Sequence, residues 1–72
     1  MKLTLTTVLG IDYSVDVEKF APLKKLKEVA SKKVKVAPQN LCLLHKSENL
    51  VGEELPLIYF GLRENSVVDI VI

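Results

Sequence analysis

Residues 21–36 read APLKKLKEVASKKVKV, and this stretch decides the fold because it holds the clearest helical pattern in the chain. Leu23, Leu26 and Ala30 recur with the spacing of one helical face, and Val29 lies beside them. Five lysines fill much of the remaining surface: Lys24, Lys25, Lys27, Lys32 and Lys33. The stretch predicts either a basic helix that meets nucleic acid or an anionic membrane, or a helix that lies across a sheet with its lysines in water.

The two ends of this helix differ in their signals. Pro22 suits a helix start, but no Ser, Thr, Asp or Asn immediately precedes it. The N-cap is therefore expected to be weaker than an ideal one by about 1 kcal/mol. Pro38 ends the helical region.

Two alternating segments precede the helix. Lys2–Thr7 places Leu3 and Leu5 on one face, and Ile11–Val17 alternates in the same way. Gly10 lies between them and can take the positive φ that a tight turn needs. The pattern predicts a β-hairpin.

Further strands follow the helix. Leu41–His45 is predicted as a strand, Lys46–Asn49 as a turn, Leu50–Val51 as a very short strand and Val67–Ile72 as the last strand. The side chains expected on the inner face are those of Leu41, Leu43, His45, Val68, Ile70 and Ile72. Those expected on the outer face are Cys42, Leu44, Val67, Asp69 and Val71.

The segment Gly52–Phe60 is expected to be a loop, because Pro56 argues against a central strand there. Leu57, Phe60 and Leu62 are expected to hold this part of the chain against the core. The order of elements predicts an α+β fold, in which one twisted sheet packs on one helix.

Composition narrows the function classes. The chain has 72 residues, a formal net charge of +1 and 49% hydrophobic residues, which suits one small globular domain. The near-zero charge argues against a nucleic-acid partner, and the apolar runs are too short to cross a bilayer. Cys42 is the single cysteine, so no internal disulfide forms and a reducing compartment is expected, the cytoplasm or the nucleus.

The whole chain resembles ubiquitin in order and spacing. Leu3, Leu5, Thr7 and Gly10 fall in that family's places without a gap, as do Val15, Val17, Leu23, Leu26, Lys27, Ala30, Pro38, Gln39, Leu43, Leu44 and Leu50. One extra residue lies between Val51 and Pro56. The phrase FGLREN, residues 60–65, is similar to one found in ubiquitin-like domains at the start of longer proteins, with a lean toward proteasome-shuttle and DNA-damage-inducible proteins.

This resemblance implies a β-grasp fold of the ββαββ type over residues 1–72, as the N-terminal domain of a longer protein. It also implies a non-enzymatic function, namely protein binding through an apolar patch on the sheet. The positions that match the family's patch are Val8, Leu44, Asp69 and Val71. Cys42 and Glu48 lie beside them and replace an arginine and a lysine of ubiquitin, and Asp69 replaces a histidine.

The expected partners are proteins of the ubiquitin–proteasome system, with no nucleic acid and no membrane, and the domain is expected to be monomeric. The acids of the patch favour a partner with basic residues around an apolar anchor, which makes ubiquitin itself a candidate. Two alternatives stay open: a covalent modifier whose Gly-Gly tail is missing from this sequence, and a domain whose lysine face binds nucleic acid or membrane.

Other chemistry is weakly signalled. Cys42 and His45 lie at an odd spacing on one strand, so their side chains point to opposite faces and no thiol–imidazole pair is expected. One cysteine and one histidine are too few for a structural zinc site, and no cofactor is expected. By resemblance to ubiquitin, Lys27 is expected to pair with an acid of the loop, Glu53 or Glu54.

Overall fold

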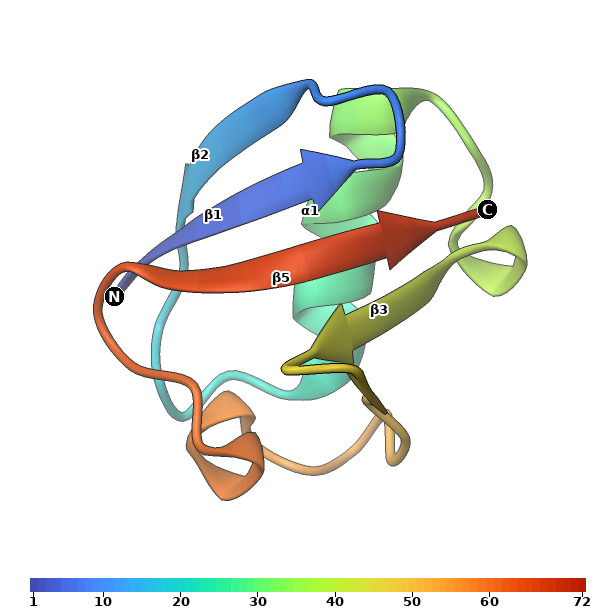
Figure 1. Cartoon of the computed structure of the whole chain (residues 1–72). Helices are drawn as coiled ribbons and strands as arrows, with labels where there is room; N and C mark the ends of the chain where they lie inside the picture. The colour runs from blue at the N-terminus through green and yellow to red at the C-terminus, as the bar shows by residue number, and fades with distance from the viewer.

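The computed structural model describes residues 1–72 and has five strands and one long helix. Figure 1 shows the helix lying behind the sheet. The strands are β1 (Lys2–Thr7), β2 (Asp12–Asp16), β3 (Cys42–His45), β4 (Glu48–Asn49) and β5 (Ser66–Val71). The helix α1 spans Leu23–Val34, and two short 3₁₀ helices, η1 (Pro38–Asn40) and η2 (Leu57–Phe60), interrupt the connections. The predicted hairpin, the crossover helix, the strand that ends at His45 and the last strand are confirmed.

The strands form a single mixed sheet in the order β2-β1-β5-β3-β4. The central strand β5 runs parallel to its neighbour β1, and the other neighbouring strands are antiparallel. The helix α1 lies across one face of this sheet, and the other face stays uncovered (Figure 1). The predicted α+β class and the β-grasp arrangement are therefore confirmed.

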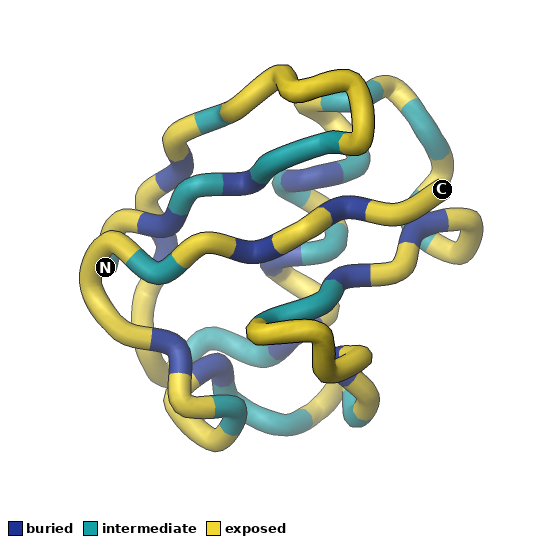
Figure 2. Tube along the Cα trace, viewed as in Figure 1, coloured by how far each residue is buried: buried dark blue, intermediate teal, exposed yellow.

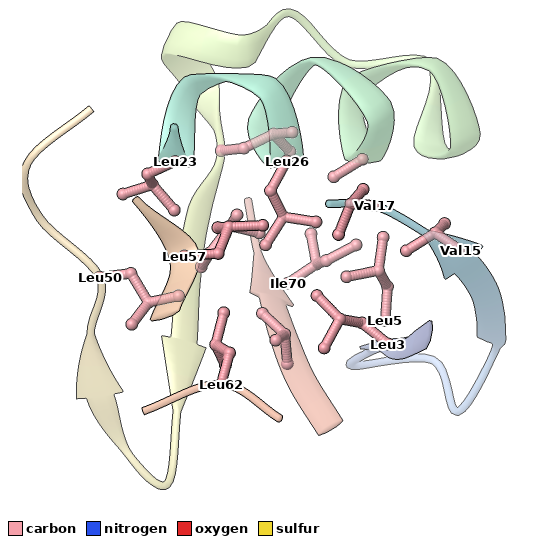
Figure 3. Close-up of a cluster of buried hydrophobic side chains, with 14 residues drawn as sticks. Leu3, Leu5, Val15, Val17, Leu23, Leu26, Leu50, Leu57, Leu62 and Ile70 are labelled. Atoms are coloured by element: carbon pink, nitrogen blue, oxygen red, sulfur yellow. The ribbon is translucent and has the colours of Figure 1, made fainter. Parts of the chain in front are cut away.

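The core fills the space between α1 and the sheet (Figure 3). It consists of 14 buried residues, and all of them are hydrophobic. Leu23, Leu26 and Ala30 supply the helix face, as their spacing predicted. Along β5, buried Val68 and Ile70 alternate with exposed neighbours (Figure 2), because successive side chains of a strand point to opposite faces.

The start of α1 is capped by a distant loop. Pro22 occupies the N-cap position, and no side chain caps the helix. Instead, the N–H of Leu23 donates to the carbonyl of Leu55 at 2.9 Å, and the N–H of Lys24 donates to the carbonyl of Glu53 at 3.0 Å. The weak sequence signal for an N-cap is therefore compensated by tertiary hydrogen bonds to orphan helix donors.

Some predicted boundaries are wrong. The helix lies within the stretch 21–36 but ends well before Pro38, because Lys35 adopts a left-handed conformation with φ 59° and closes it. The short strand is Glu48–Asn49 rather than Leu50–Val51, and the predicted turn shrinks accordingly. Leu50 is buried in the core after the strand has ended.

Two further corrections concern the end of the chain. The expected loop Gly52–Phe60 contains η2, which the hydrogen bond from the N–H of Leu57 to the carbonyl of Ala21 ties to the helix start. Ile72 was expected on the inner face, but it lies beyond the end of β5 and is 74% exposed. The predicted anchors Leu57 and Leu62 are buried, and Phe60 is half-buried against the core.

Candidate protein-interaction surface

The uncovered face of the sheet brings together the outward side chains of β3 and β5. Leu44 pairs with Asp69 across the antiparallel ladder, and Cys42 pairs with Val71 two residues along each strand. On the other side of β5, Asp69 pairs with Thr6 of β1. We call the four residues Cys42, Leu44, Asp69 and Val71 the sheet patch.

Leu44 is half-buried, yet it does not pack against the hydrophobic core. Its strand neighbour Leu43 is completely buried, which shows that the two side chains leave β3 on opposite faces. Val71 is 40% exposed, and Ile70 before it is buried. The inward and outward faces predicted from the sequence for β3 and β5 are therefore confirmed within these strands.

The other two expected site residues lie at the margins. Val8 is 85% exposed in the turn that connects β1 and β2. Glu48 is exposed on β4, where it pairs with His45 of β3. The structure thus brings Leu44, Asp69 and Val71 together on one face, while Val8 and Glu48 lie beyond two of its sides.

The charge around the sheet patch is mainly negative. Asp69 lies in the patch itself, and Asp12 of β2 follows in the same cross-strand row, because both residues pair with Thr6. Glu48 pairs with His45 and not with Leu44, so its carboxylate lies on the opposite face of β4 and does not add to the charge of the patch. Lys46, in the turn between β3 and β4, is a nearby base. A basic ligand surface suits this arrangement better than an acidic one.

The turn beside the sheet patch is shorter than the predicted turn Lys46–Asn49, and its type was not predicted. Lys46 and Ser47 have φ values of 53° and 69°, and they form a two-residue connection between β3 and β4. Both central residues of a type I′ hairpin turn need positive φ, and Asn-Gly is the usual signal for one. Lys-Ser carries no such signal, which explains why the sequence placed the turn and the strand incorrectly.

The residues considered for other chemistry lie apart. Cys42 is exposed on the outward face, and His45 is half-buried at the end of β3. No group of three or more His, Cys, Asp or Glu side chains is placed to hold a metal ion. None of the helices has the length and apolar character that crossing a membrane requires.

The lysines of α1 lie on the far side of the molecule from the sheet patch. Lys24, Lys25, Lys32 and Lys33 are exposed. Lys27 is only 17% exposed and contacts Glu53 at 3.4 Å, so of the two acids expected as its partner the structure selects Glu53. Glu54 pairs instead with Lys24, at 3.3 Å.

A single sheet of five strands in the order β2-β1-β5-β3-β4, packed on one helix, defines a ubiquitin-like β-grasp fold. The chain is similar over 50 residues to the Midnolin homolog of Drosophila melanogaster, with 36% identity. The aligned part covers 69% of this chain, and the chain spans only 4% of that relative. No protein-family model matches the chain.

Proposed function

We propose that the chain is a non-enzymatic protein-interaction domain that docks its host protein to components of the ubiquitin–proteasome system. The sheet patch, with Val8 at its margin, is the proposed docking surface. The proposed partners are a proteasome receptor, ubiquitin or a ubiquitin-binding domain. The chain is proposed to bind them as a monomer, in the cytoplasm or the nucleus. This function resembles that of the ubiquitin-like domains of proteasome-shuttle and DNA-damage-inducible proteins.

The pairing of Leu44 with Asp69 carries the proposal, because it sets an apolar side chain against a carboxylate on an uncovered face. Val71 extends the apolar part, and Cys42 replaces the basic side chain that ubiquitin has there. An apolar anchor with an acidic surround fits a partner whose own apolar anchor is ringed by bases. Ubiquitin has such a surface, which makes it the first partner to test.

The chain is proposed to be one domain, the N-terminal one, of a longer protein. The much greater length of the Midnolin homolog supports this proposal, since the chain spans 4% of it. A patch of this kind supports a small interface, and the expected dissociation constant is on the order of micromolar or weaker.

The proposal is tested by titrating unlabelled ubiquitin into the ¹⁵N-labelled chain while the backbone amide resonances are recorded. We expect the amides of Leu44, Asp69 and Val71 to shift in a saturable manner, and those of Lys25 and Lys32 on α1 to stay in place. Unmoved resonances at the sheet patch with ubiquitin near millimolar concentration would exclude ubiquitin as the partner. The same titration with a proteasome receptor domain then tests the wider proposal.

A further inference from the structure

A second apolar surface lies around the edge of the sheet from the sheet patch. A groove of about 410 Å³ runs between the β1–β2 turn, the last turn of α1 and the end of β5. These three segments are far apart in the sequence and meet beside the C-terminus (Figure 1). Its apolar lining includes Ile11, Tyr13, Val34 and Ile72. Val8 and Val71 of the proposed docking surface also line it, so the groove adjoins the sheet patch at that end.

The groove has a packed floor and exposed walls. Val34 and Tyr13 are half-buried and pack against the core. The walls of the groove include Ile11, which is 48% exposed, and Ile72, which is 74% exposed, so large apolar side chains there are accessible to a ligand. Contiguous exposed apolar surface in a small domain marks an interaction site more often than scattered residues do.

The polar rim of the groove is basic. Lys33 and Lys35 are both exposed and both line the groove, and no Asp or Glu is among its lining residues. The ion pairs of α1, Lys24–Glu54 and Lys27–Glu53, lie at the opposite end of the helix. Lysines near a helix C-terminus also stabilise the helix by interacting favourably with its dipole. Their positive charge therefore indicates a ligand only in combination with the apolar groove.

We propose that this lysine-rimmed groove binds a peptide segment whose apolar side chains are flanked by aspartate or glutamate. The apolar residues lie between Ile11 and Ile72, and the flanking carboxylates reach Lys33 and Lys35. The charge preference is opposite to that of the sheet patch, whose acids select a basic partner. The larger hollow beside Phe20 and Ile58 is lined by acids and bases together, so its charge selects no such partner.

The test uses two short synthetic peptides with the same leucine and phenylalanine residues, placed among aspartates in one and among lysines in the other. Each is titrated into the ¹⁵N-labelled chain. The acidic peptide is expected to shift the amides of Ile11, Tyr13 and Val34, and to bind at least about tenfold more tightly than the basic one. The proposal is overturned by equal binding, by shifts centred on Leu44 and Asp69, or by no shifts near millimolar peptide.

A charge-matched pair of variants sharpens the test. The double variant Lys33→Gln with Lys35→Gln is expected to weaken binding of the acidic peptide about three- to tenfold, because two positive charges at the rim are lost. Lys19→Gln with Lys25→Gln removes the same charge elsewhere, at exposed positions outside both surfaces, and is expected to change binding less than about twofold. Equal losses in both pairs would show non-specific attraction and would overturn the proposal. Ubiquitin binding at the sheet patch is expected to survive both pairs, so the two proposals fail independently.

Discussion

Leu44 of β3 and Asp69 of β5 pair directly across the antiparallel ladder between these two strands, on the face that the helix leaves uncovered. An apolar side chain and a carboxylate are thereby fixed side by side on two strands of one sheet, which is a rigid support. Because neither residue belongs to the hydrophobic core, substitutions of Leu44 or Asp69 are expected to change partner binding without a large change in the stability of the fold.

Leu44→Ala is expected to weaken ubiquitin binding by about 1–3 kcal/mol if Leu44 is the central anchor. The thermal midpoint is expected to change little, because the side chain faces away from the core. Calorimetric titration and a thermal melt measure the two effects. The matched control is Leu43→Ala, which removes a completely buried side chain and is expected to cost about 2–5 kcal/mol of stability. A large fall in the midpoint of Leu44→Ala would contradict its outward orientation.

Asp69→Lys is expected to slow association with ubiquitin and to reverse the salt dependence of binding, because it replaces the acid at the centre of the sheet patch with a base. Association rates at low and at moderate ionic strength measure this effect. Glu28→Lys makes the same change in net charge on an exposed position of α1 and serves as the control. If both variants slowed association equally, the overall charge rather than the patch would control it.

Gly52→Ala is expected to destabilise the fold by about 1–3 kcal/mol. Gly52 has φ +113°, and a Cβ atom there would lie 2.5 Å from Cδ1 of Leu55 and 3.1 Å from its Cγ. Leu55 would have to move, and its carbonyl caps α1. Urea unfolding measures the loss. Gly10→Ala is the control, because Gly10 has φ +81° but open space around it, and its cost is expected to be smaller.

The ion pair between Lys27 and Glu53 is expected to contribute about 0.5–1 kcal/mol, more than the Lys24–Glu54 pair, for which we expect less than about 0.5 kcal/mol. The reason is shielding from water: the Lys27 side chain is 17% exposed and the Lys24 side chain is 51% exposed. Two double-mutant cycles with glutamine replacements measure the coupling energies. Equal coupling in the two cycles would show that shielding has no effect here.

Ser47→Gly is expected to stabilise the fold by about 0.5–1 kcal/mol, because glycine adopts the positive φ of this turn without steric cost. Ser47 has φ 69° in the connection between β3 and β4. Ser14→Gly makes the same replacement inside β2 and is expected to destabilise by a similar amount. Denaturant unfolding curves of both variants decide the point, and a destabilised Ser47→Gly would contradict the turn geometry.

The element types and the inner and outer faces were predictable because they depend on local geometry. Side chains alternate along a strand and recur every 3.6 residues along a helix, so neighbouring residues alone fix which face each occupies. This holds for Leu23 on the helix and for Leu44 and Asp69 on the strands. Ile72 was misplaced because the alternation applies only while the strand continues, and β5 ends at Val71.

The sequence by itself determined the helix stripe, the alternation of the strands and hence the outward position of the sheet patch. Tertiary structure alone decided that the carbonyls of Glu53 and Leu55 cap α1, and that Lys27 pairs with Glu53 while Lys24 takes Glu54. It also assembled the lysine-rimmed groove from three separate segments. The physical reason is distance along the chain: local periodicity fixes the direction of a side chain, but packing decides which remote group it meets.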